Sequence, residues 1–298
     1  MKIRAPKGLG AAARACHPPG MSENDPDALI RGRYGITPDT PLPFAPVPEV
    51  APALAALLDR RVTRRYAAAP VPEPLLQTVL AGAQSAPSKS DLQQYAIIVL
   101  QDAAKIARIA DWIGGMDWIK QAPVFLLFCG DIRRGRRVAA LHGRDHANDN
   151  VDTFLNATAD AALALGFTVM AAEHAGLGTC PISYVRNHVE KIAPLCALPR
   201  GVFPVAGLTL GWPEGAQLAL APPAAGAGGA SRDLRRQRPG GRPPGLRRRP
   251  PAGEAALPRD PRAGARGCGW SQNAARQLSV PERFGLRTWL KLQGLSLD

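Results

Sequence analysis

Several features are scarce or missing in this sequence, and each absence excludes a class of protein. The five cysteines form no Cys-x-x-Cys pair, which argues against a zinc knuckle or a disulfide framework. Polar residues break every apolar run before the roughly 18 to 20 residues that a bilayer requires. The basic N-terminus is followed by no secretory core. We therefore expect a cytoplasmic protein with no spanning helix and no membrane partner.

Common active-site signatures are missing as well. No Gly-x-Gly-x-x-Gly follows a strand pattern, and no Walker sequence occurs. No Gly-x-Ser-x-Gly elbow is present, and no acidic cluster lies near a histidine. His142 and His146 are four residues apart and could share a helix face, but no third ligand accompanies them. The sequence therefore predicts no metal site.

Aromatic residues make up only 5% of the chain, but 46% of it is hydrophobic, which suffices for a sizeable core. The formal net charge is +13 and the isoelectric point is near 10.2. A charge of that size suggests a nucleic acid or another anionic surface as partner. The distribution of the charge along the chain weakens this interpretation.

Most of the excess charge lies in one low-complexity segment, residues 216–267. Of its 52 residues, 12 are Ala, 11 Arg, 9 Pro and 9 Gly, and its net charge is +8. Such a segment has too few large apolar residues to form a core, and Pro and Gly disfavour helices and strands. We expect it to be irregular. The rest of the chain carries only +5.

Two interpretations of this segment remain open. It could be a basic arm that binds nucleic-acid phosphates through clusters such as the arginines at 247–249. Alternatively, a GC-rich gene read in a shifted frame yields this composition. The abrupt edges after Pro213 and before Trp270 favour the shifted frame. A weaker bias of the same kind precedes Met21, which makes Met21 a candidate start.

Between residues 46 and 213, the hydrophobic pattern predicts helices and strands in mixed order. The predicted helices span 52–60, 75–83, 151–174 and 187–195, and the predicted strands span 95–100, 124–129, 180–184 and 203–210. On the long helix we expect one broad buried face, made of Phe154, Leu155, Thr158, Ala162, Leu165, Val169 and Ala172. Because strands and helices do not alternate strictly, the pattern favours an α+β sandwich.

A concentrated basic motif precedes Tyr66, at the end of the first of these helices. It contains four arginines, of which Arg61 and Arg64 are three residues apart and able to converge on one anion. A phosphate is the natural counter-ion. The alternative is a solvated helix end whose positive charge complements the helix dipole.

Six short blocks follow one another in an order and spacing that resemble one family. They are RVTRRY at 61–66, APSKSDLQ at 86–93, GGMDWIKQAP at 114–123, GLGTCPIS at 176–183, VRN at 185–187 and GLTLGWP at 207–213. Together they resemble the FMN-dependent nitroreductases, in particular the branch of oxygen-insensitive NADPH nitroreductases and flavin reductases. Residues 270–290 also resemble the end of that branch.

This resemblance implies a three-layer α+β sandwich with a central mixed sheet, and a homodimer with FMN at the subunit interface. It implies electron transfer from NADPH or NADH to a small-molecule acceptor, namely a nitroaromatic, a quinone or free flavin, by a ping-pong hydride mechanism. The cofactor supplies the redox chemistry in such proteins, so we assign no catalytic acid, base or nucleophile. Nucleic acid is not an expected partner of such an enzyme.

The resemblance also implies which residues bind the cofactor. The first block would hold the FMN phosphate and ribityl chain, and the hydroxyl of Ser88 would reach a flavin held mainly by the other subunit. The strand backbone at 181–183 would lie against the isoalloxazine ring. The predicted cofactor-binding residues are Arg60, Arg61, Thr63, Arg64, Ser88, Asp91, Gln93, Met116, Pro181, Ile182 and Ser183.

The predicted organisation has four parts. They are an irregular N-terminal extension (1–45), the FMN domain (46–215), the low-complexity segment (216–268) and a C-terminal helical tail (269–298). The family's second basic phosphate contact would fall inside the third part. The alternatives to a working enzyme are therefore a frameshift-damaged member with impaired flavin binding, or a nucleic-acid-binding protein that acts through the Arg-rich segment.

Overall fold

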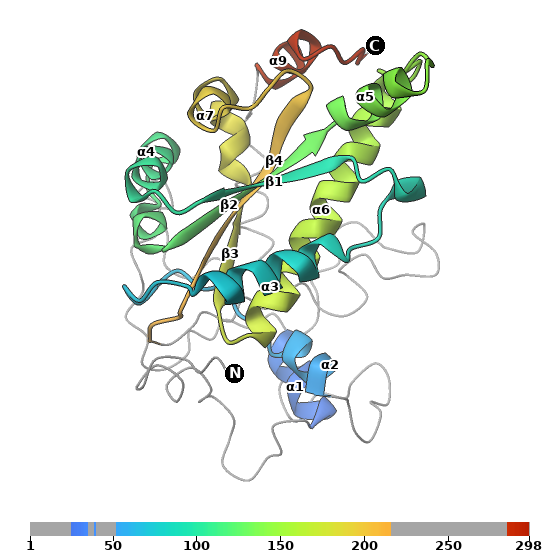
Figure 1. The fold of residues 1–298 in the computed structure, drawn as a ribbon. Coiled ribbons are helices and arrows are strands. Elements are labelled where there is room, and N and C mark those ends of the chain that lie inside the picture. Colours follow the sequence, from blue (N-terminus) through green and yellow to red (C-terminus); the bar gives the residue numbers. More distant parts are fainter. Residues whose placement is uncertain (1–24, 35–38, 40–51, 216–284, 298) are drawn as a thin grey trace. The chain divides into compact units, whose positions relative to one another are not determined.

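The structure, a computed structural model, describes residues 25–34, 39, 52–215 and 285–297 (Figure 1). These residues fall into two compact units that divide between Val62 and Thr63, and residues 285–297 belong to the second. The low-complexity segment and Met21 lie outside the described residues. The predicted boundaries after 45, 215 and 268 lie outside them or at their edge. All of these remain predictions.

The first unit contains two helices, α1 (Pro26–Tyr34) and α2 (Pro52–Leu58). The second of them confirms the helix predicted from residue 52, although it ends two residues earlier than expected. Leu29 and Ala55 are buried in a small apolar cluster, and Leu58 packs against it. The connection that follows α2 in this unit carries Arg60 and Arg61.

A four-stranded sheet forms the centre of the second unit. Its strands are β1 (Tyr95–Leu100), β2 (Val124–Asp131), β3 (Gly178–Ile182) and β4 (Val202–Gly211), in the order β1-β2-β4-β3. All four predicted strands are confirmed, except that Ser183 and Tyr184, expected at the end of the third, lie in the short helix after β3. Every pairing within the described sheet is antiparallel, so the mixed sheet that we expected is not found in this part of the chain.

The central strand β2 is buried on both faces, and its side chains alternate between two apolar clusters. Leu126 and Phe128 enter the cluster that contains α3 and α6 residues. Phe125 and Leu127 enter the cluster that contains α4 and α7 residues. A core on each side of one sheet confirms the predicted three-layer α+β sandwich.

Helices cover both faces of this sheet (Figure 1). On one face lie α3 (Glu73–Gln84) and α6 (Val151–His174), and on the other lie α4 (Ala103–Ile113) and α7 (Val189–Leu195). The predictions of α3, α6 and α7 are confirmed, whereas α4 and α5 (Arg133–Leu141) were not predicted. The remaining described elements are the 3-10 helices η1 (Lys89–Asp91), η2 (Asp117–Gln121) and η3 (Ser183–His188), and α9 (Leu286–Leu292) within the predicted helical tail.

The inner face of α6 differs from the face predicted for it. Ala157, Ala161 and Ala164 are fully buried against the sheet, whereas Leu155 is 62% exposed and Ala162 is also exposed. Small side chains let the helix approach the sheet closely, and the bulky Leu155 is left on the outside. The prediction from helical spacing was therefore wrong at Leu155 and Ala162.

Among the described residues, α6 is the one helix with the length and apolar composition of a membrane span. The expectation that no helix would meet those two criteria is therefore wrong. The same helix packs against α3 and the sheet, and its buried Asp160 accepts hydrogen bonds from a neighbouring loop. These are contacts that a core helix makes.

Candidate functional site

The stretch from Thr63 to Tyr66, here called the strap, runs beside the sheet. The amide of Thr63 donates to the carbonyl oxygen of Thr179 in β3 at 2.9 Å. Tyr66 pairs with Pro213 just beyond β4, and the amide of Ala67 donates to the carbonyl oxygen of Trp212 at 2.9 Å. The strap therefore bridges the start of β3 and the end of β4.

The buried hydroxyl of Tyr66 connects the strap to β4 by hydrogen bonds. It donates to the carbonyl oxygen of Thr63 at 2.8 Å and shares a second hydrogen bond of 2.8 Å with Oγ1 of Thr209. Oγ1 of Thr209 also lies 3.3 Å from the carbonyl oxygen of Cys180. Burial raises the pKa of Tyr66, so the hydroxyl stays neutral and able to donate.

Two buried polar atoms of the strap lack a protein partner. They are Oγ1 of Thr63 and Nε of Arg64, neither of which forms a hydrogen bond with any described residue. The guanidinium carbon of Arg64 lies 5.7 Å from the ring centre of Trp118. Because unpartnered buried donors are costly, a cation and a hydroxyl in this state suit a phosphate ligand. The strap therefore fits the phosphate end of FMN.

Gly178 allows the strap to lie this close to β3. A Cβ atom at residue 178 would lie 2.3 Å from Oγ1 of Thr63, which is far inside van der Waals contact. The absence of a side chain at Gly178 is therefore a requirement for the position of Thr63.

Arg60 and Arg61 belong to the unit that ends at Val62. Nη2 of Arg61 lies 2.8 Å from Oδ1 of Asp59, and Nη1 donates to the carbonyl oxygen of the same residue at 2.6 Å. Much of the guanidinium of Arg61 is thus engaged by Asp59. The convergence of Arg61 and Arg64 on one anion remains a prediction.

Three other predicted residues, Ser88, Asp91 and Gln93, lie together in the loop between α3 and β1. Oδ1 of Asp91 accepts a hydrogen bond from Nε2 of Gln93 at 2.9 Å, and Oγ of Ser88 accepts one from the amide of Gln93 at 3.4 Å. Ser88 is half-buried and Asp91 is exposed. The structure therefore brings these residues into one polar loop, although their contacts to a cofactor remain predictions.

Of the three residues predicted to lie against the flavin ring, Pro181 and Ile182 end β3 and Ser183 begins η3. The side chain of Ile182 is buried in the cluster with α4 and α7, whereas Pro181 and Ser183 are exposed. Within the described sheet, β3 is an edge strand that pairs with β4. A flat ligand could therefore lie against this edge, two residues along β3 from the strap.

Met116 lies in the turn between α4 and η2, and its half-buried side chain packs against the cluster of α4 and α7. Two glycines precede it, Gly114 and Gly115, each with φ of +66°. Trp118, two residues later, stacks with Arg64 and was not among the predicted site residues. The sequence signal for it was its place in the GGMDWIKQAP block.

The two histidines considered as metal ligands do not share a helix face. His142 follows the end of α5 and is exposed, and Nδ1 of His146 lies 3.1 Å from Oδ1 of Asp149. In the described part of the chain, no group of three or more His, Cys, Asp or Glu side chains is placed to hold a metal ion.

The fold and the site define a class: a three-layer α+β protein in which a strap with two unpartnered buried polar atoms lies beside an edge strand. The sequence matches the nitroreductase family over residues 57–212. This chain therefore belongs to the nitroreductase family.

Two curated proteins are similar to this segment. One is FMN reductase [NAD(P)H] from Bacillus subtilis (strain 168), 39% identical over 162 residues, which are 54% of this chain and 65% of that protein. Another is the oxygen-insensitive NADPH nitroreductase of Salmonella typhimurium, 31% identical over 55% of this chain and 67% of that protein. The chain thus aligns with about two thirds of the length of these relatives.

A solved structure supports the fold over a longer stretch. NfrA2 from B. megaterium superposes with a TM-score of 0.70 at 28% sequence identity, over 84% of this chain and 100% of that structure. NADPH:FMN oxidoreductase from Vibrio harveyi, solved in complex with NAD+, shares the fold with a TM-score of 0.60 at 21% identity.

Proposed function

We propose that this chain is an FMN-dependent oxidoreductase that transfers electrons from NADPH or NADH to nitroaromatics, quinones or free flavin. When bound, FMN would supply two-electron hydride chemistry between the nicotinamide and the second substrate, in the alternating half-reactions of a ping-pong scheme. Family membership and the names of the similar proteins, an FMN reductase and an NADPH nitroreductase, support this proposal.

The observation that carries the proposal is the pair of unpartnered buried atoms in the strap. Among the described residues, five buried side-chain polar atoms have no hydrogen-bond partner, and two of them lie in adjacent residues, Thr63 and Arg64. In this role Arg64 would bind the FMN phosphate, Thr63 would add a hydroxyl, and Trp118 would keep the guanidinium plane in place. Tyr66 would hold the strap against the sheet.

The remaining predicted residues have roles in orientation. The backbone of Pro181, Ile182 and Ser183 would lie against the isoalloxazine ring. Ser88, Asp91 and Gln93 would present polar groups to a flavin held mainly by the other subunit. No side chain need move a proton in this scheme, so we assign no general acid or base.

We further propose that the protein is a homodimer and that α6 contributes to its interface. One side of α6 carries a row of exposed apolar residues: Val151 is 53% exposed, Leu155 62%, Leu163 41% and Met170 37%. A row of this length on one helix face is typical of a surface that another protein covers. We also propose a cytoplasmic location, with no membrane or nucleic-acid partner.

The experiment that tests the proposal uses the purified full chain. We expect it to be yellow, or to become so after incubation with FMN and removal of excess, and to oxidise NADPH or NADH only when an acceptor is present. Protein that stays colourless and gains no flavin absorbance after incubation would contradict the proposal.

A further inference from the structure

The loop between α3 and β1 has an unusual backbone conformation. Ser90, Asp91 and Gln93 adopt φ values of +51°, +53° and +50°. Residues other than glycine rarely occupy this left-handed region, and each instance costs of order 1 kcal/mol or more. Three of them in four residues persist only if the surrounding structure holds the loop in place.

A buried carboxylate on α6 provides that support from one side. Asp160 is 1% exposed. Its Oδ1 accepts a hydrogen bond from the amide of Lys89 at 2.9 Å, and its Oδ2 accepts one from the amide of Gln94 at 3.0 Å. These two amides bracket the three residues with positive φ. One side chain therefore holds both ends of the strained segment.

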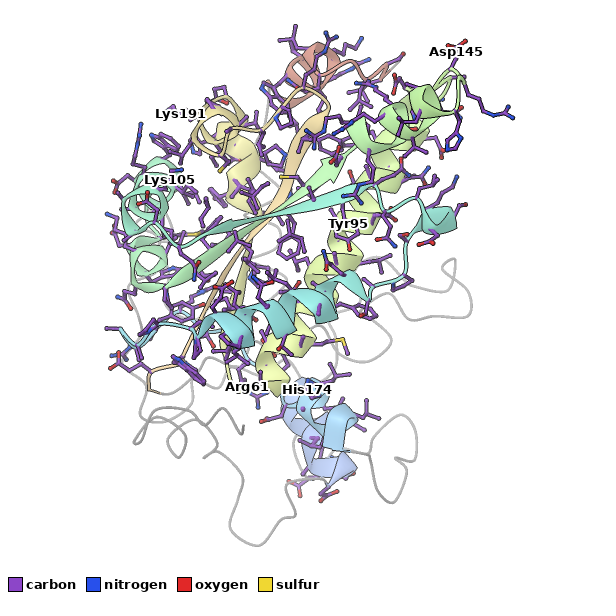
Figure 2. All side chains as sticks on the ribbon, viewed as in Figure 1. Arg61, Tyr95, Lys105, Asp145, His174 and Lys191 are labelled. Carbon is purple, nitrogen blue, oxygen red and sulfur yellow. The ribbon has the colours of Figure 1, made fainter. Side chains whose placement is uncertain are left out.

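An arginine on α5 donates hydrogen bonds to carbonyl oxygens at the end of the loop. Nη1 of Arg134 donates to the carbonyl oxygen of Gln93 at 2.6 Å, and Nη2 donates to that of Tyr95 at 3.3 Å. Tyr95, labelled in Figure 2, begins β1 and is buried on the α6 side of the sheet. The loop is thus fixed by an anion that accepts from its amides and by a cation that donates to its carbonyls.

We infer that Asp160 is a positioning residue for the cofactor: it holds the 88–94 loop so that Ser88, Asp91 and Gln93 face the flavin. This inference rests on the proposed function. The two charge-assisted hydrogen bonds to the loop offset the cost of burying a carboxylate in the middle of a helix. Asp160 itself need not touch the cofactor.

The test compares Asp160→Asn with a control on the same helix, Thr168→Val. An amide at residue 160 can accept from one backbone amide, but its NH2 group would then face the other donor. The control removes a fully buried hydroxyl that bonds to the carbonyl oxygen of Ala164, far along the helix from the loop. We expect Asp160→Asn to weaken FMN binding at least tenfold and Thr168→Val less than twofold.

A second measurement reports on the loop without flavin. Hydrogen exchange at the amides of Lys89 and Gln94 should accelerate at least tenfold in Asp160→Asn and stay unchanged in Thr168→Val. If Asp160→Asn does not fold, Arg134→Ala on the surface removes the carbonyl contacts and should weaken FMN binding about threefold.

The outcomes separate this inference from the proposed function. If the unmodified protein binds no FMN, the proposed function fails, and the inference fails with it. If the unmodified protein binds FMN and Asp160→Asn, or Arg134→Ala in its place, binds it equally well, the inference is overturned and the proposed function stands. Equal losses in Asp160→Asn and Thr168→Val would also overturn the inference, because general destabilisation would then explain both.

Discussion

At the scale of single residues, the site depends on close approach as much as on charge. Thr63 lies against Gly178 at a distance that no other residue permits, and its hydroxyl is buried without a partner. The hydroxyl of Tyr66, at the end of the strap, forms hydrogen bonds with both Thr63 and Thr209 in β4. The sequence blocks indicated which residues matter here, but not that a glycine on β3 sets the position of the strap.

Replacing Gly178 should therefore damage both stability and binding. In Gly178→Ala the added methyl group would displace Thr63, and we expect a loss of about 1–3 kcal/mol in the free energy of unfolding together with weaker FMN binding. Gly166→Ala is the matched control, because a Cβ there meets nothing within 4 Å and lies in a helix. Urea unfolding and FMN titration measure the two effects, and equal behaviour of the two variants would refute the argument.

The half-buried thiol of Cys196 leads to a prediction about the pH dependence of stability. Burial raises its pKa from 9.0 to about 11, so the folded state keeps the proton at a pH where the unfolded state releases it. The contribution of this thiol to the free energy of unfolding is therefore fully present below about pH 9. It falls by roughly 1–3 kcal/mol as the pH rises toward 11. Between pH 8 and pH 11, the free energy of unfolding should fall less steeply with pH in Cys196→Ala than in the unmodified protein. An equally steep fall in both would contradict the assignment.

At the scale of helices and strands, the sequence predicted the elements whose periodicity is clear. The β2 run and the long α6 stand out because their apolar patterns are long. The helix α4 has Ile106, Ile109 and Ile113 at helical spacing and a capping Asp102, so it could have been predicted from the same rules. The helix α5 buries no residue, and its pattern therefore gave no signal.

The inner face of α6 illustrates what periodicity alone misses. Asp160 and Thr168 are buried because of specific hydrogen bonds, one with a loop about 70 residues away in the sequence. A polar residue in a helix is ordinarily assigned to the exposed side. Only the tertiary contacts reveal that here polar and small residues face inward and several large apolar residues face outward.

The outward apolar face of α6 leads to a prediction about assembly. In Leu155→Glu, a charge replaces a 62% exposed leucine, which would be unfavourable only if another subunit covers it. We expect the Leu155→Glu variant to be a folded monomer. The control, Leu292→Glu, changes a 69% exposed leucine on α9 and should leave the dimer intact. Sedimentation velocity distinguishes these cases, and an unaffected dimer in Leu155→Glu would exclude this face from the interface.

At the scale of the whole molecule, the net charge of +13 is a poor guide to function. Residues 216–267 carry +8 of it, and these residues lie outside the described structure. The fold could be predicted because ordered motifs span most of the three-layer unit. The site could be predicted only in part, since Trp118, Asp160 and Gly178 act through contacts that a single sequence does not display.

The central claim is that the strap binds the phosphate of FMN, and one paired titration tests it most directly. The flavin-free protein and its Arg64→Ala and Arg65→Ala variants are each titrated with FMN, Arg65 being the neighbouring exposed arginine. Loss of a charge-assisted contact worth about 1.5–3 kcal/mol should weaken binding roughly 10- to 100-fold in Arg64→Ala. Binding should change less than twofold in Arg65→Ala. Equal affinities in the two variants, or a larger loss in Arg65→Ala, would contradict the account.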